Sequence, residues 1–237
     1  MKKITRALCL VLISAGIFAI WLTPQPAGAE VRLFVDKHTV RVNDPGLGQP
    51  SILNDFNPSG YRTHNYLALV WNSHSVWVYD IRTHQWMSTE GFAPMSGLLS
   101  DELALVWERG RVAVYSAPDH SWVVSAELPS PITGQLISRG MAAVTCEDAF
   151  VVYDPVLKTW QTAGDFMVGD AELGDNLAVA WDENDALIYD LTLHQWVMKE
   201  GIAPQACIVE PFKVSIYSSD RIYIYDAMSH RWQDMPR

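Results

Sequence analysis

The stretch LALVWNSHSVWVYDIRTHQW, residues 67–86, decides the fold, because its features recur along the chain. After Tyr79, equivalent tyrosines follow at intervals of 36, 38, 36 and 36 residues, and a tryptophan stands seven positions after each of the five. A fixed period of this length indicates a repeat architecture. The two recurring columns are Tyr79, Tyr115, Tyr153, Tyr189 and Tyr225, and Trp86, Trp122, Trp160, Trp196 and Trp232.

The tyrosines belong to closely similar phrases. Four of these read VYDIRTHQW, VYDPVLKTW, IYDLTLHQW and IYDAMSHRW, whereas VYSAPDHSW has Ser116 in place of the aspartate. A sixth, eroded copy precedes them: VRLFVDKHTVRVND, residues 31–44, aligns with residues 67–80, with Asn43 in the tyrosine column and Pro50 in the tryptophan column. We therefore predict one domain, residues 30–237, made of units at about 31–56, 57–92, 93–128, 129–166, 167–202 and 203–237.

Each unit has the pattern of short β-strands. In ELALVWERGRVAVYS, residues 102–116, two apolar runs rich in valine flank the polar turn ERG, which is typical of a hairpin. Four strands in each repeat, without a sustained helical period, predict an all-β fold: a β-propeller of four-stranded blades. We expect six blades with the first one incomplete; in the alternative, five blades form the ring and the N-terminal copy is an extra hairpin outside it.

The phrases VYDPVLKTWQ and VYDIRTHQWM resemble the second half of the kelch repeat, and the resemblance covers residues 57–237 and more faintly 31–56. It implies a propeller that most often binds proteins, whereas a minority of the family are oxidases or carbohydrate-active enzymes. The chain departs from the family at the end of the second strand, where kelch repeats carry two glycines. Here these positions hold Val70-Trp71, Val106-Trp107 and Ala180-Trp181.

The first 29 residues have the pattern of a secretory signal peptide. A basic start, MKKITR, precedes the apolar run ALCLVLISAGIFAIWL, and the segment ends in the small-residue pattern Ala27-Gly28-Ala29. We expect a secreted or periplasmic protein without stable membrane insertion after cleavage; an uncleaved anchor is the alternative.

The mature chain is acidic. Without Lys2, Lys3 and Arg6, the 17 basic residues fall to 14 against 27 acidic ones, a net charge of −13. This charge repels phosphate backbones, so we expect no nucleic-acid partner. We also expect no bond between Cys146 and Cys207, which lie at different heights of units two apart, and a monomeric state.

The recurring side chains are best explained by structure. The tyrosines and tryptophans supply large apolar area between blades, and the aspartate after each tyrosine can accept hydrogen bonds from backbone amides of its own turn. His84, His120, His194 and His230 occupy one turn position in different blades, so they point outward and cannot converge on a metal. We expect no metal and no cofactor.

Residues that break the repeat are the candidates for a binding face. The first strands of the units should line the channel and their ends should form its mouth, where polar residues replace the apolar pattern. Arg62 and Glu172 would then face each other across the axis. The candidate binding residues are Arg62, His64, Asn65, Asp101, Arg139, Asp170, Glu172, Asp175 and Glu210.

These features favour an exported binding or scaffold module for a protein or glycan ligand. The alternative is a carbohydrate-active enzyme, a glycosidase or lyase, in which Asp170, Glu172 and Glu210 act as inner-strand carboxylates. The enzyme is the less favoured of the two, because no catalytic motif is present and units of 36 residues leave no room for long loops.

Overall fold

The computed structural model describes residues 30–237, and the signal peptide predicted for residues 1–29 lies outside this range. The described chain is all-β and forms six antiparallel sheets. The first sheet has three strands and each of the other five has four, as predicted. No helix within residues 30–237 is long and apolar enough to cross a bilayer.

The strands follow the six sequence units closely. The first three sheets consist of β1 Arg32–Asp36, β2 Thr39–Asn43 and β3 Ser51–Asn54; β4 Gly60–His64, β5 Leu67–Trp71, β6 Ser75–Asp80 and β7 Gln85–Glu90; and β8 Ser96–Leu99, β9 Leu103–Trp107, β10 Val112–Ser116 and β11 Ser121–Val124. The last three consist of β12 Ile132–Ile137, β13 Ala142–Cys146, β14 Ala149–Asp154 and β15 Thr159–Gly164; β16 Asp170–Leu173, β17 Leu177–Trp181, β18 Ala186–Asp190 and β19 Gln195–Lys199; and β20 Ala206–Glu210, β21 Lys213–Tyr217, β22 Arg221–Asp226 and β23 Arg231–Pro236.

Within each sheet the strands pair in chain order, as a meander. The turns after the first and third strands of a four-stranded sheet therefore lie at one end of the strands. The turn after the second strand lies at the opposite end. The first sheet lacks the innermost strand, so β1 pairs only with β2 among the described residues. This leaves one side of β1 as an open sheet edge.

The core lies between successive sheets. Strand β5 shows why its sequence LALVW is apolar throughout: Leu67 and Leu69 pack against the third sheet, whereas Ala68 and Val70 pack against the first. Strands buried on both faces have continuous apolar runs instead of alternation. Val40 and Val42 of β2 pack on the second sheet, so the N-terminal copy is a sixth sheet and not an extra hairpin.

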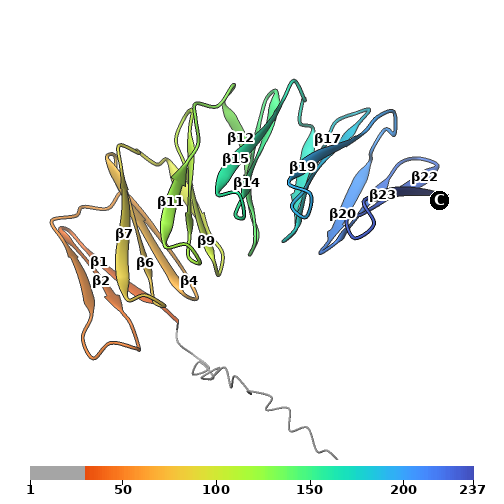
Figure 1. Cartoon of the computed structure of the whole chain (residues 1–237). Helices are drawn as coiled ribbons and strands as arrows, with labels where there is room; N and C mark the ends of the chain where they lie inside the picture. Colours follow the sequence, from red (N-terminus) through yellow and green to blue (C-terminus); the bar gives the residue numbers. More distant parts are fainter. Residues whose placement is uncertain (1–29) are drawn as a thin grey trace, which may run out of the picture.

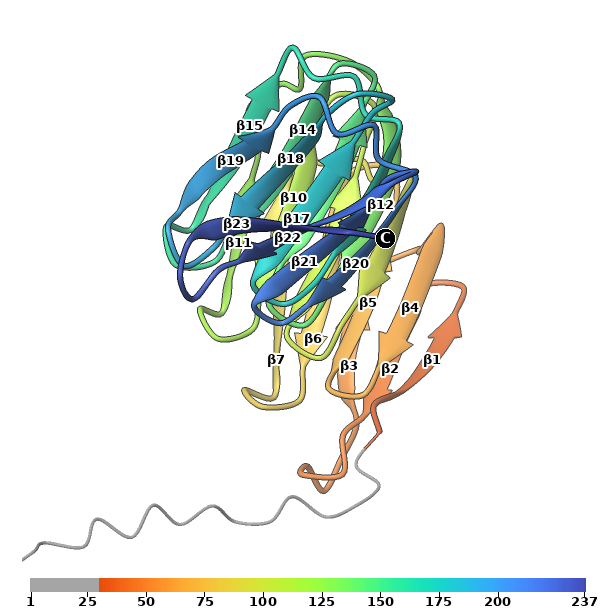
Figure 2. The same ribbon diagram turned by 90° about the vertical axis from the view of Figure 1, so that its right-hand side faces the viewer.

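The six sheets follow one another along a curved row, with the first and last sheets at opposite ends (Figure 1). Figure 2 views this row from its C-terminal end. Arg62 lies in β4 of the second sheet and Glu172 in β16 of the fifth, so two sheets stand between theirs along the row. The described cysteines, Cys146 and Cys207, are both free thiols, and burial raises their pKa to about 11 and about 12.

Candidate functional site

Asp154 joins two neighbouring sheets. Its Oδ1 accepts backbone N–H groups of Val156 and Leu157 in its own turn, both at 2.8 Å. Its Oδ2 accepts the O–H of Tyr189 at 2.6 Å and lies 2.7 Å from Nδ1 of His194, and both of these residues belong to the next sheet. One oxygen thus caps the local turn and the other holds the following sheet. We call this arrangement the relay, and the edge of the row that carries it the relay edge.

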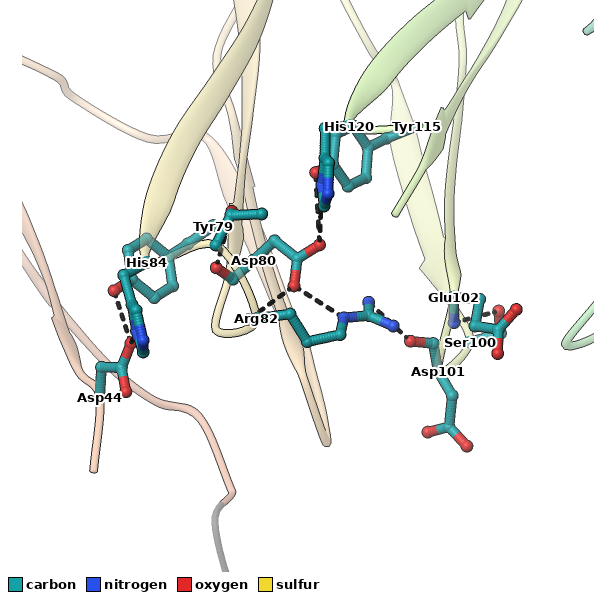
Figure 3. Close-up of polar contacts among 11 residues, drawn as sticks. Asp44, Tyr79, Asp80, Arg82, His84, Ser100, Asp101, Glu102, Tyr115 and His120 are labelled. Carbon is teal, nitrogen blue, oxygen red and sulfur yellow. Dashed lines mark hydrogen bonds and ion pairs between the residues drawn. The ribbon is translucent and has the colours of Figure 1, made fainter. Parts of the chain in front are cut away.

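The relay recurs with the period of the sequence. Oδ2 of Asp44 accepts the O–H of Tyr79 at 2.7 Å and lies 2.5 Å from Nδ1 of His84. The corresponding distances from Asp190 to Tyr225 and His230 are 2.7 and 3.3 Å. At the junction of the second and third sheets the relay is looser (Figure 3). There Asp80 lies 3.4 Å from the Tyr115 hydroxyl and 3.9 Å from His120, and Arg82 Nε donates to its Oδ1 at 2.9 Å.

The relay and its burial shift the pKa values of three carboxylates and of their tyrosine partners. Burial alone would raise the pKa of Asp154, but the hydrogen bonds from Tyr189, Leu157 and His194 outweigh it and hold the pKa below its ordinary value. The same balance lowers the pKa of Asp44 and Asp190. Burial and the neighbouring carboxylate raise the pKa of Tyr189 well above its usual range. At neutral pH each such carboxylate is therefore an acceptor and each tyrosine a donor.

The junction of the third and fourth sheets lacks the relay. Ser116 replaces the aspartate, and Lys158 replaces the histidine. Asp119 supplies a carboxylate at this junction: it accepts the Ser116 hydroxyl at 2.8 Å and pairs with Lys158 at 2.5 Å. The buried hydroxyl of Tyr153 has no hydrogen-bond partner among residues 30–237. Burial, together with the charge of Asp119, raises its pKa to about 12.

A hollow of about 470 Å³ opens on the relay edge where this relay is missing. It spans turns of the third, fourth and fifth sheets, and its polar lining residues are Glu102, Ser116, Asp119, Arg139, Asp175 and Asn176. Arg139 is 68% exposed at its side chain and forms two bonds to Glu102 Oε1, at 2.8 and 2.9 Å. The hollow therefore offers an accessible guanidinium beside several carboxylates, a lining suited to polar or charged groups.

The structure places four further candidates in contacts between neighbouring units. Asn65 donates to Asp101 at 2.6 Å, and His64 lies 3.3 Å from the same carboxylate. The Arg139 backbone N–H donates to Asp175 Oδ1 at 3.1 Å. Their partners stand 36 or 37 positions apart, so part of the polar cluster expected to bind a ligand also ties one unit to the next.

The remaining candidates are dispersed. Arg62 lines a hollow of about 340 Å³ together with His64, on the second and third sheets. Asp170 lines another, of about 660 Å³, between the fourth and fifth sheets. Burial raises the pKa of Glu172, which lies near the backbone of Val209 in the sixth sheet. Glu210 pairs with Lys213 of its own hairpin at 2.9 Å.

Sequence reasoning missed Ser116 and Asp119, which line the hollow, and Tyr153, whose buried hydroxyl belongs to the same junction. The available signal was the single phrase without aspartate, VYSAPDHSW, followed one unit later by a lysine in the histidine column. Across residues 30–237, no group of three or more histidine, cysteine, aspartate or glutamate side chains is arranged to hold a metal ion.

The aromatic columns lie inside the sheets and not at the relay-edge hollow. Each recurring tyrosine packs against the tryptophan of its own unit, with ring centroids 4.9–5.6 Å apart. Trp122 and Trp160 also donate their indole N–H to backbone carbonyls of the preceding sheet, at 3.3 and 3.1 Å. These contacts use the aromatic faces for packing between units.

No family model matches the chain, and no curated protein matches it significantly in sequence. Similar solved structures include Hsv2 of Kluyveromyces lactis, at a TM-score of 0.38 and 13% identity, where the match covers 73% of this chain and 60% of Hsv2. Sqt1 of Saccharomyces cerevisiae matches at a TM-score of 0.40 and 10% identity, over 86% of this chain and 69% of Sqt1. The AfRom2 CNH domain matches at 0.35 and 12%, over 90% and 82%.

The chain thus spans about 60% of the length of Hsv2. At these identities and TM-scores the likeness says nothing about ligands. The fold itself, with five meandering four-stranded sheets and one of three strands, is that of a repeat protein built from propeller-type blades.

Proposed function

We propose that this protein is an exported, kelch-like binding module that holds a protein or glycan ligand at the relay-edge hollow between the third and fifth sheets. The observation that carries the proposal is the coincidence of this hollow with the one described junction where the relay is replaced. Four relays use their polar groups to hold sheets together. At the remaining junction the Tyr153 hydroxyl is left without a partner, and charged side chains line an accessible hollow.

The chemistry of the hollow supports recognition of polar ligands. The buried Ser116 hydroxyl and the partly exposed carboxylates of the lining favour ligands that form hydrogen bonds with them, because a polar group buried without a partner costs about 1–3 kcal/mol. Arg139 provides a planar donor group for carboxylate or carbonyl oxygens. Asp119 and Asp175 provide acceptors for hydroxyl or ammonium groups. A peptide with charged side chains and an oligosaccharide both satisfy this set.

The test is binding of the purified protein to glycan and peptide arrays. Arg139→Ala and Asp119→Asn should each weaken the strongest signal at least about tenfold, because each removes a charge-assisted bond worth about 1.5–3 kcal/mol. Arg109→Ala, at an exposed turn of the opposite edge, is the matched control and should leave binding unchanged. Equal losses in all three variants, or full binding by the Arg139 variant, would contradict the site.

The enzyme alternative rests on one observation, the raised pKa of Glu172, which suits a general acid. Glycosidases need two carboxylates that flank one bond. A screen with aryl glycosides and Glu172→Gln separates the two functions: a glycosidase would lose turnover in this variant, whereas a binding module has no turnover to lose.

A further inference from the structure

The last sheet has a face that is built like an inter-sheet contact but has no neighbour among the described residues. In the second sheet, the face that includes Leu69, Trp71 and Val78 is buried against the third sheet. The equivalent residues of the last sheet are Ser215, Tyr217 and Ile224, and the strands on either side add exposed apolar groups. On this face Ile208 is 50% and Met235 43% exposed. An apolar sheet face of this kind marks an interaction surface.

The free face of the first sheet differs in chemistry. Where the second sheet has Ala68 and Trp77, the first has Arg32 and Arg41, and both arginines are exposed. Neither forms an ion pair within residues 30–237. Phe34, 53% exposed, and Ile52, 46% exposed, add an apolar part. The last face is largely apolar and carries Glu210 and Asp226 beside Lys213 and Arg231, whereas the first face carries Arg32 and Arg41 beside Asp36.

The last sheet also carries a relay aspartate whose hydrogen-bond donors are missing among the described residues. Asp226 stands in the aspartate column of the last sheet, and its Oδ1 caps its own turn through Met228 and Ser229, at 2.8 and 3.1 Å. In the part of the chain that the structure describes, its Oδ2 accepts no hydrogen bond, although in other units this oxygen receives the tyrosine and histidine of the next sheet. Asp226 is therefore a relay acceptor without a donor.

The first sheet has room for a partner at the matching position. Its unit carries Asn43, Gly48 and Pro50 in the tyrosine, histidine and tryptophan columns. All three line a hollow of about 440 Å³, together with Arg32, which pairs across the strands with Asn43. Small residues have replaced the large donors of the other units, and an arginine stands beside the gap.

We propose that the end faces bind each other between two copies of this chain, head to tail, with Arg32 and Asn43 of one copy donating to Asp226 of the other. A guanidinium already binds an aspartate of this column within one turn, where Arg82 Nε lies 2.9 Å from Asp80 Oδ1. In the proposed contact Arg32 takes the place beside the aspartate that a histidine ring takes in the other relays, and the apolar groups of both faces are covered. Two copies joined at both ends form a closed ring.

A second copy fits the structure better than closure of one chain on itself. The two end sheets lie at opposite ends of the curved row (Figure 1). Bringing them together within one chain would change the packing and the relay distances at all five junctions, because packed interiors resist continuous deformation. Contact between two separate copies does not require the two ends of one chain to meet. This proposal departs from the monomer expected from the sequence.

The test uses exchanged charges and analytical ultracentrifugation at low ionic strength. The wild-type protein should form a dimer that dissociates on dilution. Asp226→Arg alone and Arg32→Asp alone should each be monomeric, because each places like charges at both junctions. An equimolar mixture of the two variants should regain the dimer, because one junction then has the native pair and the other the reversed pair.

Several results would overturn the proposal. They are a wild-type protein that stays monomeric at millimolar concentration, single variants that still dimerise, or a mixture that stays monomeric; the last two would point to ring closure within one chain or to another contact. Lys37→Glu, at the exposed turn between β1 and β2, is the control and should dimerise like wild type. If circular dichroism shows that Asp226→Arg does not fold, Ile208→Lys replaces it and should also be monomeric, since Ile208 has no part in a turn or relay.

Discussion

At the scale of single residues, the aspartate column explains why the phrase Tyr-Asp recurs. The Asp154 carboxylate has two oxygens with separate tasks, one within its turn and one toward the next sheet. A serine can perform only part of this work, which is why Ser116 depends on Asp119 and leaves Tyr153 without a partner. The same tyrosine side chain is therefore bonded in four units and unbonded in one.

This difference predicts unequal effects of one substitution. Tyr189→Phe removes a hydrogen bond to a buried carboxylate and should lower the free energy of unfolding by about 1.5–3 kcal/mol. Tyr153→Phe removes a buried hydroxyl that has no partner in the described structure, so it should be neutral or stabilising. Urea denaturation of both variants measures the difference. Equal losses would show that Tyr153 has a partner in solution.

The lowered pKa of Asp154 predicts an acid-sensitive contribution to stability. Because the native pKa lies below the unfolded value of about 3.9, the unfolded chain binds more protons, and stability falls as the pH drops through the native pKa. Asp154→Asn should cost about 1.5–3 kcal/mol at pH 7, because it weakens hydrogen bonds to a buried carboxylate. Its deficit should shrink below pH 4. Denaturation at pH 7, 5 and 3.5 checks this, and a deficit independent of pH would contradict it.

The sequence predicted one of the two roles of the recurring aspartates, the hydrogen bonds within their own turns. That an aspartate after tyrosine accepts amide protons of its own turn follows from local chemistry, and the structure has these bonds in Asp80, Asp154 and Asp190. The other half could not be predicted, because the donors lie 35 and 40 positions further along the chain. Which side chain of the next unit meets which oxygen depends on how two sheets stack, and a repeat pattern does not contain that information.

At the scale of elements, the turn after the third strand is held in an unusual backbone conformation. The residue five positions after each recurring tyrosine has a positive φ: His84 58°, His120 50°, Lys158 55°, His194 55° and His230 53°. This region costs a residue with a Cβ about 1–2 kcal/mol. The histidines offset that cost through the relay, whereas Lys158 forms only an ion pair in which it is 57% exposed.

Glycine substitutions should therefore have opposite effects at two equivalent turns. Lys158→Gly relieves the backbone strain, loses an exposed ion pair worth about 0–1 kcal/mol, and should leave stability unchanged or slightly raised. His194→Gly relieves the same strain but leaves the buried Asp154 carboxylate short of a partner, so it should lower the melting temperature. Differential scanning calorimetry compares the two. A larger loss at Lys158 than at His194 would contradict this account of the turn.

At the scale of the whole molecule, each sheet contacts only its neighbours along the row (Figure 1). Stability in such an arrangement is a sum of unit and nearest-neighbour terms. The number of units, their strands and the structure of the eroded first copy followed from the 36-residue period. The open curve of the row did not, because repetition determines that sheets stack and leaves the angle between them undetermined.

The row predicts a gradient of amide protection. At high dilution, amides of β13, β14, β17 and β18 should exchange slowest, because their sheets are covered on both faces. Amides of β1, β3 and β23 should exchange fastest, since these strands lie at the ends of the row. Hydrogen–deuterium exchange with mass spectrometry gives the profile. Uniform protection of all six sheets would indicate a ring closed within one chain.

The relay also has a direction. Every carboxylate lies earlier in the chain than the hydroxyl and imidazole that it binds, and the 38-residue unit holds the one junction with a different arrangement. During synthesis, which proceeds from the N-terminus, a newly emerged unit therefore carries an unsatisfied acid until most of the following unit has appeared. The relay bonds of a unit can form only after the next unit has been synthesised. The nascent protein therefore gains stability in steps, each one unit later than the synthesis of the aspartate concerned.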